Sequence, residues 1–302
     1  MVSPSDDDKR RNELLQQLVK RGQGGSRFVK APSLNAVHAL HQRFPHFVEV
    51  IDHVLGELAL LASSGARPRR LTPLLLLGNP GIGKTRFVHD LATALAVPFT
   101  VVPMNTATGG FLLSGLDRSW SGAKPGMVFD MLMNHRCVNP VVLLDELEKA
   151  QHDGKYDPLA PMYQLLETST ARRFVDEYVQ VPVNAGLITW VATANTIDKL
   201  PPAIVSRLRV FEVNTPTPQQ MRPVVDGLLQ TLRHDAPALS HDVPSEALDR
   251  LCQLTPRAAA SALSMAAGRA ALRARLARQG LIELRVCDFE AGAPPRPRMG
   301  FY

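Results

Sequence analysis

The chain has 302 residues, of which 45% are hydrophobic and 21% are charged, and its formal net charge is +6. This composition is typical of a soluble globular protein with one large domain or two smaller ones, and it excludes a membrane protein because no apolar run approaches the ~18–20 residues of a membrane span. The positive charge permits contact with nucleic acid without requiring it, because a basic surface is also ordinary.

Residues 1–35 are polar and charged, and they predict a flexible basic arm with room for one short helix at residues 13–20. The arm has no apolar core, so it does not have the pattern of a secretory signal. The three cysteines are isolated and lack the C-x-x-C spacing of a metal site, so we interpret them as reduced thiols: Cys137, Cys252 and Cys287. We therefore expect a cytoplasmic protein.

Residues 36–63 predict two amphipathic helices with a break at Phe44-Pro45, and an alternation of strands and helices follows. Short apolar strands are expected at residues 74–77, 99–103, 141–144, 187–193 and 210–213. Strands of this kind, separated by helices, predict a parallel five-stranded sheet flanked by helices. Ligands of such α/β sheets bind at the carboxyl ends of the strands.

A breaker cluster at residues 215–218 marks the predicted boundary between two domains. The α/β domain would cover residues 36–214, and a small helical lid with an extended tail would cover residues 215–302. The lid pattern is helical at residues 219–233, 245–254 and 257–279. Its last helix has no acid and carries Arg269, Arg273, Arg275 and Arg278 in its second half.

The segment after the first predicted strand fits the phosphate-binding pattern G-x-x-x-x-G-K-[ST] at every position. Its residues are Gly78, Asn79, Pro80, Gly81, Ile82, Gly83, Lys84 and Thr85. A strand before the loop and a helix after it are the context that the pattern requires. The glycines allow backbone N–H groups to point at phosphate oxygens, and the helix N-terminus adds partial positive charge. Lys84 would reach the β- and γ-phosphates of ATP, and Thr85 would place its hydroxyl on Mg²⁺.

Two later strands end in polar residues that would meet this loop at the same edge of the sheet. Asp145 and Glu146 follow an apolar strand, where Asp145 would orient Mg²⁺ and Glu146 would activate the attacking water as general base. Asn195 ends the next buried strand and would hold the same water or touch the γ-phosphate. The alternatives are solvated acids at a strand end and a turn-forming asparagine.

Two arginines complete the predicted catalytic set. Arg207 precedes the last strand, a place from which an arginine reaches the nucleotide of a neighbouring subunit and stabilises transition-state charge. Arg257 begins a helix of the lid and would contact the γ-phosphate from there. The alternative for Arg207 is a surface salt bridge.

This order of motifs resembles the AAA+ ATPases, and within them it is most similar to the ATPase module of Lon proteases over about residues 40–290. The segments that carry the resemblance to Lon are residues 143–149, 119–126, 174–181 and 191–196. Residues 119–126 resemble the Lon loop whose aromatic residue grips the translocating polypeptide. The resemblance therefore implies a substrate loop formed by Trp120, Ser121 and Gly122, with Trp120 where Lon has tyrosine. The alternative is a tryptophan packed within its loop.

The resemblance implies an ATP-hydrolysing motor that remodels, unfolds or translocates proteins as a ring, expected to be a hexamer, with a protein substrate or adaptor as partner. Lon's N-terminal region and protease domain have no counterpart here, so we expect an ATPase without intrinsic peptidase activity. Two other functions stay open. One is an ATP-switched DNA-acting protein, such as a loader or transposition helper, which the basic arm and the arginine helix favour. The other is an assembly subunit that binds ATP without turnover.

Overall fold

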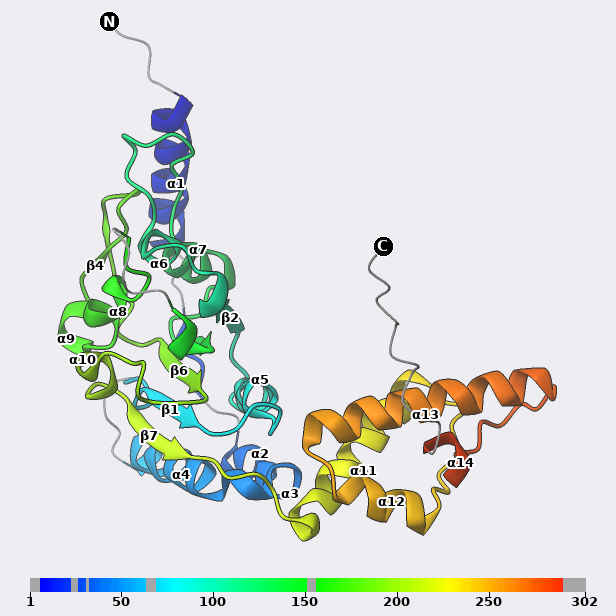
Figure 1. Cartoon of the computed structure of the whole chain (residues 1–302). Coiled ribbons are helices and arrows are strands. Elements are labelled where there is room, and N and C mark those ends of the chain that lie inside the picture. The colour runs from blue at the N-terminus through cyan, green and yellow to red at the C-terminus, as the bar shows by residue number, and fades with distance from the viewer. Residues whose placement is uncertain (1–5, 23–26, 31–32, 64–68, 151–155, 290–302) are drawn as a thin grey trace, which may run out of the picture. The chain divides into compact units, whose positions relative to one another are not determined.

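A computed structural model describes five stretches of the chain: residues 6–22, 27–30, 33–63, 69–150 and 156–289. The chain divides into two units (Figure 1). The first unit comprises residues 1–41, 47–80 and 84–213, and the second comprises residues 42–46, 81–83 and 214–302. The main division therefore lies between Val213 and Asn214, beside the breaker cluster.

A five-stranded sheet forms the centre of the first unit. Its strands are β1 (Leu74–Leu77), β2 (Phe99–Pro103), β3 (Val141–Asp145), β6 (Thr189–Ala194) and β7 (Arg209–Glu212), in the order β2-β3-β6-β1-β7. All four neighbouring pairs are parallel, so the predicted parallel α/β sheet is confirmed. The register pairs Leu77 with Ala194 and Pro103 with Asp145, which brings the carboxyl ends of these strands to one edge.

The strands inside the sheet are almost purely apolar because helices and loops cover them. The side chains of β1 and β3 are buried apart from their last residues, and every residue of β6 is buried. Apart from the N-terminal helix, the longer helices of the first unit are α4 (Val48–Ser63), α5 (Lys84–Ala94) and α7 (Met127–His135). Shorter ones are α2 (Leu34–His38), α6 (Phe111–Ser114), α8 (Ala160–Leu165), α9 (Thr168–Ala171) and α10 (Pro202–Val205). The short helix α3 (Leu40–Arg43) contains residues of both units. Single 3₁₀ turns are η1 (Pro45–Phe47), η2 (Met104–Thr106) and η3 (Leu147–Lys149).

The N-terminal arm is more structured than the sequence predicted. Its helix α1 spans Asp6–Gly22, whereas only residues 13–20 were expected to be helical. Leu14 and Leu15 pack against a small apolar cluster of the first unit, and Arg11 Nε donates to the carbonyl oxygen of Val179 at 3.1 Å. The prediction of a flexible arm is therefore wrong for α1, because apolar contacts that local composition does not reveal hold the helix. Residues 1–5, 23–26 and 31–32 lie outside the described residues.

A two-stranded antiparallel sheet stands beside the main one. It pairs β4 (Phe174–Val175) with β5 (Pro182–Val183), and the turn between them contains the buried carboxylate Asp176. Asp176 is important below because it bonds to the loop that carries Trp120.

The second unit is helical, with α11 (Pro218–Asp235), α12 (Ser245–Cys252), α13 (Pro256–Leu276) and α14 (Val286–Phe289). Thr217 begins α11 with a reciprocal capping box to Gln220, and the Thr255 side chain caps α13. Apolar residues of α11, α12 and α13 form one core, in which Val225, Leu251 and Leu263 are buried. The predicted extended tail at residues 292–298 lies outside the described residues.

All three cysteines are free thiols, and Cys287 is the exposed one. None of the helices within the described stretches combines the length and the apolar character that a membrane crossing requires.

Candidate active site

The phosphate-binding loop has the backbone that its glycines allow. Gly81 and Gly83 adopt φ angles of +81° and +98°, in the region that L side chains rarely enter. Helix α5 begins directly after them at Lys84. Within the second unit, the N–H of Arg257 donates to the Gly81 carbonyl at 3.0 Å, and His46 Nε2 donates to the Ile82 carbonyl at 2.8 Å. Burial lowers the pKa of His46, which favours the neutral ring in this bond.

Lys84 holds its ammonium group inside the loop. The residue is only 8% exposed, and its Nζ donates to the carbonyl oxygens of Gly78 at 2.6 Å and Asn79 at 3.0 Å. A third bond of 3.1 Å reaches Oδ1 of Asn195 at the end of β6. A buried cation that touches two loop carbonyls and one amide is suited to an anionic ligand, because the ligand can take over these contacts.

Asp145, at the end of β3, connects the loop to the sheet. The Thr85 hydroxyl lies 3.2 and 3.3 Å from the two oxygens of the Asp145 carboxylate. The Thr193 hydroxyl on β6 donates to Asp145 Oδ1 at 2.5 Å and accepts the N–H of Glu146 at 3.0 Å. Thr193 therefore fixes both acidic residues relative to the sheet.

Glu146 occupies a strained backbone position with φ of 57° and ψ of 51°. Left-handed backbone in a non-glycine residue is uncommon and occurs preferentially at functional sites. Its carboxylate accepts a bond of 3.0 Å from Asn105 Nδ2 and pairs with Lys149 Nζ at 2.9 Å. The carboxylate of the candidate base is thus held by two side chains from different elements.

Asn195 lies between a cation and an acid. Its Oδ1 accepts from Lys84, and its Nδ2 donates to Glu148 Oε1 at 2.6 Å. Glu148 is buried, with 8% of its surface exposed, and therefore orients the Asn195 amide so that the oxygen faces Lys84.

The donor set at this edge fits a nucleotide with Mg²⁺. Thr85 and Asp145 offer a hydroxyl and a carboxylate, which are the oxygen ligands that Mg²⁺ prefers. Across the described stretches, no group of three or more His, Cys, Asp or Glu side chains could hold a metal ion. A metal here would therefore complete its shell with phosphate oxygens and water, as Mg²⁺ does in nucleotide sites.

Arg207 lies apart from this constellation, at the end of helix α10. Its Nε pairs with Glu167 Oε1 at 3.1 Å, its Nη1 donates to the Ala203 carbonyl at 2.5 Å, and its guanidinium lies 5.9 Å from the ring centroid of Tyr163. These three contacts all lie within the first unit, and none of them involves the phosphate loop. A role for Arg207 at a neighbouring subunit's nucleotide stays a prediction.

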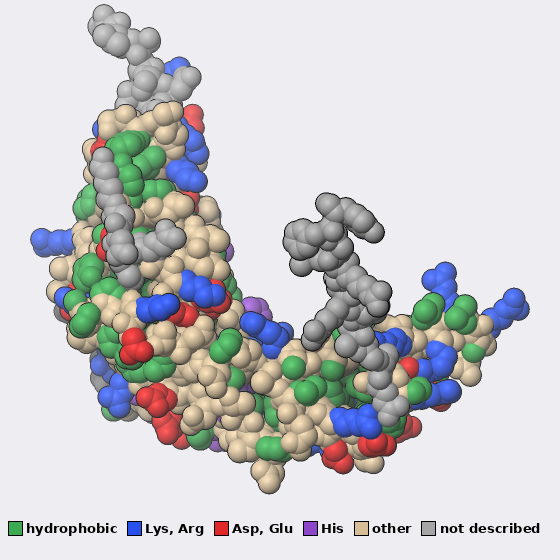
Figure 2. All heavy atoms as spheres, viewed as in Figure 1, with side chains coloured by type: hydrophobic (Ala, Val, Ile, Leu, Met, Phe, Trp, Pro, Cys, Tyr) green, Lys and Arg blue, Asp and Glu red, His purple; other side chains and the backbone are tan. Residues whose placement is uncertain are grey.

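The arginines of α13 are partly engaged within the second unit. Arg269 Nη1 donates to the Asp288 carbonyl at 2.6 Å, and Arg273 pairs with the Asp288 carboxylate. This pairing contributes to the lowered pKa of Asp288. Arg275, in the last turn of α13, and Arg278, just after the helix, are exposed, and cationic and apolar side chains stand together at this end of the helix (Figure 2). Asp288 of α14 thus partly neutralises the positive charge of α13. Less of this charge is then available to bind nucleic acid.

The loop that carries Trp120 has a firmly bonded base. Gly115 and Gly126 stand so close that a Cβ added to Gly126 would lie 2.3 Å from the Gly115 nitrogen. The Asp176 carboxylate accepts N–H bonds from Gly126 at 2.7 Å and from Tyr178 and Val179 at 3.0 Å. Burial is the largest influence on Asp176 and raises its pKa.

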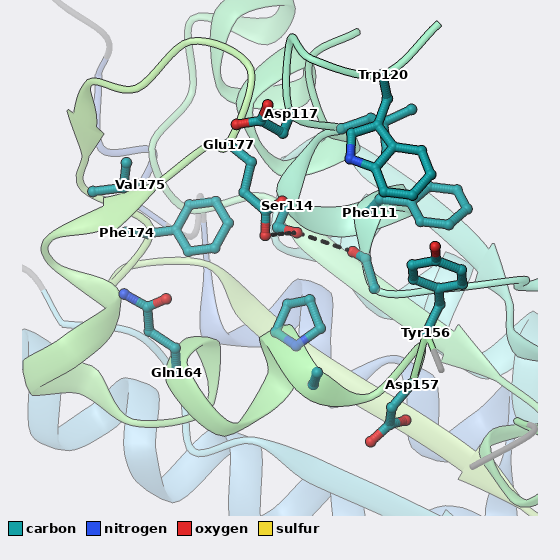
Figure 3. A pocket seen from close by; sticks show the side chains of 14 residues that line it. Phe111, Ser114, Asp117, Trp120, Tyr156, Asp157, Gln164, Phe174, Val175 and Glu177 are labelled. Atoms are coloured by element: carbon teal, nitrogen blue, oxygen red, sulfur yellow. Dashed lines mark hydrogen bonds between the residues drawn. The ribbon is translucent and has the colours of Figure 1, made fainter. Parts of the chain in front are cut away.

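The tip of the loop is open. The side chain of Trp120 is 50% exposed, and the neighbouring Ser121 and Gly122 are exposed as well. Gly122 has a φ angle of +79°. The indole contacts Tyr156 edge-to-face, with ring centroids 6.0 Å apart, and Tyr156 contacts Phe111 in the same manner at 6.4 Å (Figure 3). Trp120 is therefore not a core residue, although one face of it has an aromatic neighbour.

Sequence reasoning missed several residues that orient the site. Asn105, Thr193, Glu148 and Lys149 act through their bonds to the predicted residues. Thr193 could have been found, since it lies two residues before Asn195 near the same strand end. Asn105 follows β2, and its proximity to Glu146 can be inferred only if β2 is known to be the neighbour of β3.

Comparison with known families matches residues 74–215 to the ATPase family associated with various cellular activities (AAA). Several curated relatives are Lon proteases. The mitochondrial Lon protease homolog of Schizosaccharomyces pombe is 31% identical over 166 residues, which is 55% of this chain and 15% of that protein. The Lon protease of Chloroflexus aurantiacus is 32% identical over 156 residues, or 52% of this chain and 19% of that protein. The Lon protease of Ureaplasma parvum is 30% identical over 190 residues, or 62% of this chain and 24% of that protein.

The chain thus spans less than a quarter of the length of these relatives, and the similarity covers the ATPase region.

Proposed function

Since residues 74–215 match the AAA family of ATPases and the chain is similar to Lon proteases over about half of its length, we propose that this chain is a motor that hydrolyses ATP to unfold or translocate polypeptides. It would act as a ring of identical subunits, for which a hexamer is the expected size. The proposal concerns ATP hydrolysis and protein remodelling, and it does not extend to peptide-bond cleavage.

The observation that carries the proposal is the arrangement of polar groups at one edge of the sheet. Lys84 and Thr85 begin α5, and they bond respectively to Asn195 at the end of β6 and to Asp145 at the end of β3. This edge then brings together a glycine-rich loop, a cation, a hydroxyl–carboxylate pair for a metal, and a carboxylate on a strained backbone. Phosphoryl transfer to water needs such a set.

Each residue has a role in that reaction. Lys84 would neutralise phosphate charge, and Thr85 with Asp145 would hold Mg²⁺, which would supply positive charge to stabilise the transition state. Glu146 would take a proton from the attacking water, because it is the carboxylate beside the metal ligand whose position Asn105 and Lys149 fix. Asn195, oriented by Glu148, would hold that water or the γ-phosphate.

Two arginines would supply further charge. Arg207 would serve the nucleotide of the next subunit, which requires it to leave Glu167 or to carry Glu167 into the interface. Arg257 is the second residue of α13 and bonds to Gly81 within the second unit, and we expect it to report the state of the loop to the helices that follow.

Protein as the substrate is favoured by the Trp120 loop. An aromatic side chain that is half exposed on a loop with a rigid base loses apolar contact unless a ligand packs on it. In a ring this ligand would be a threaded polypeptide.

The ATPase rate under three conditions tests the proposal: protein alone, with a permanently unfolded protein, and with duplex DNA. We expect stimulation by the unfolded protein and little change with DNA. Stimulation by DNA alone would replace the motor with the DNA-acting function. Nucleotide binding without turnover in any condition would indicate an assembly subunit.

A further inference from the structure

A cavity of about 410 Å³ lies beside the Trp120 loop in the first unit (Figure 3). Its described lining includes three acids and three large exposed or half-exposed rings, namely Asp117, Asp157, Glu177, Phe111, Trp120 and Tyr156. None of the described lining residues is Lys, Arg or His. The chain as a whole has a net charge of +6, so this lining runs against the general charge of the molecule.

Two of the acids face the rings across the cavity, whereas Asp157 lies on the side of Tyr156. Figure 3 shows Phe111, Trp120 and Tyr156 gathered on one side, with Asp117 and Glu177 across from them. Tyr156 is nearly perpendicular to both other rings, at interplanar angles of 75° and 86°. Aromatic faces attract organic cations through their quadrupole, and carboxylates add direct charge attraction. The two kinds of lining therefore favour the same class of ligand.

The acids are held in place by local bonds. Oδ1 of Asp117 accepts the Ser119 N–H at 2.8 Å, and Oδ1 of Asp157 accepts the Leu159 N–H at 2.8 Å. Ser119 bonds also keep the pKa of Asp117 below its usual value, so this carboxyl stays charged at neutral pH. Carboxylates fixed in this way lose little conformational entropy when a cation binds.

The acids of this cavity are not arranged to bind a metal ion. In the stretches that the structure describes, no three His, Cys, Asp or Glu side chains are close enough to share one, so the acids of this cavity are too dispersed for a coordination shell. Dispersed carboxylates and aromatic faces suit a long organic cation whose stem lies on the rings while its head meets the acids.

We infer that this cavity receives an arginine or lysine side chain of the polypeptide that the Trp120 loop holds. The inference rests on the proposed function and adds the class of substrate to it: unfolded segments rich in basic residues. The mouth of the cavity supports a chain as ligand, because Trp120 and Val175 on β4 are exposed by 50% and 44% at its edge. Arginine is favoured over lysine, because its planar guanidinium stacks on rings and bonds to carboxylates with several N–H groups.

Fluorescence anisotropy with two labelled, unstructured peptides of equal length tests this inference. One peptide carries several arginines, and the other carries glutamine at those positions. Both are titrated with Glu146→Gln protein in the presence of ATP, so that the complex does not turn over. We expect about ten-fold tighter binding of the arginine peptide, which corresponds to about 1.4 kcal/mol. The preference should shrink at high salt.

Variants that remove charge but keep shape assign the preference to the cavity. The triple variant Asp117→Asn, Asp157→Asn, Glu177→Gln should bind both peptides alike, whereas Glu49→Gln, an exposed acid on α4, should keep the preference. If the triple variant does not fold, Glu177→Gln alone, at an exposed position, should still lower the preference about three-fold.

Equal binding of the two peptides to the parent, or an unchanged preference in the charge variants, would overturn the inference. The proposed function is scored separately, by ATPase stimulation with an unfolded protein that lacks arginine and lysine. Stimulation without a peptide preference would overturn only the inference. A preference that depends on the acids would uphold it, even if no unfolded protein stimulates hydrolysis and the motor function fails.

Discussion

The edge of the sheet and the Trp120 cavity both gather charged side chains, but they balance the charges differently. At the sheet edge, the charged groups bond within the chain: Lys84 to Asn195, and Glu146 to Lys149. In the cavity, carboxylates line the wall without a cation among the described lining residues. The first region is a network that a ligand must rearrange, whereas the described lining of the second offers acids and rings and no Lys, Arg or His.

The ligand of each region is therefore recognised from a different feature of the molecule. At the sheet edge the sequence motif identifies it, because glycines, lysine and a hydroxyl at fixed spacing match phosphate and metal. In the cavity no motif exists, since Phe111, Trp120, Tyr156 and Glu177 come from separate segments of the chain. Shape and charge in three dimensions must identify that ligand.

The largest effect is expected from substitutions that break the network at the sheet edge. Lys84→Ala should lose nucleotide binding, because it removes the buried cation of the loop. Glu146→Gln should keep binding and lower turnover by about 10²–10⁴-fold, the usual contribution of a general base. Binding of a fluorescent ATP analogue and the steady-state ATPase rate measure the two effects. Hydrolysis at the parent rate by Glu146→Gln would show that the assigned base is wrong.

The next effect concerns Arg207, which belongs to neither region within one subunit. Arg207→Ala should bind ATP and hydrolyse it about 10²-fold more slowly, less than the ~10³–10⁵ of arginine fingers in other phosphoryl-transfer enzymes. Mixing Arg207→Ala with Lys84→Ala subunits should recover some activity, because each supplies what the other lacks at one interface.

Glu167→Gln is the matched control for this experiment, because it removes the salt-bridge partner of Arg207 and keeps the arginine. It should hydrolyse ATP at close to the parent rate. If mixed subunits assemble and recover nothing at any ratio, Arg207 does not act between subunits.

The smallest expected effect concerns the base of the Trp120 loop. Asp176→Asn replaces one carboxylate oxygen with an NH₂ group that cannot accept its backbone N–H bond. We expect a loss of about 1–3 kcal/mol in the free energy of unfolding, measured by urea titration. Glu49→Gln is the control, since Glu49 is exposed on α4 and its replacement should change stability by less than about 0.5 kcal/mol. Equal stability of parent and Asp176→Asn would mean that these bonds do not hold the loop.

Much of the fold was predictable because its signals are local. The apolar runs of β1, β3 and β6 and the breaker at residues 215–218 are visible in a few consecutive residues. The helix α1 was underestimated, because its contact with Val179 joins positions far apart in the sequence.

The candidate site shows the same limit. Lys84, Thr85 and Asp145 follow from motifs, whereas the bond from Asn105 to Glu146 depends on the neighbouring positions of β2 and β3. Asp176 looks like an ordinary loop acid in the sequence, and only its burial and three N–H bonds reveal its role.

ATP-driven unfolding of a protein tests the central claim most directly. The substrate is a stably folded fluorescent protein with an unstructured, arginine-containing tail, and loss of fluorescence reports unfolding. The account predicts ATP-dependent loss with the parent and with Trp120→Tyr, which keeps an aromatic ring, and none with Trp120→Ala or Glu146→Gln. Basal ATPase and assembly of Trp120→Ala should stay near the parent values. Unfolding by Trp120→Ala at the parent rate, or by Glu146→Gln without turnover, would contradict the account.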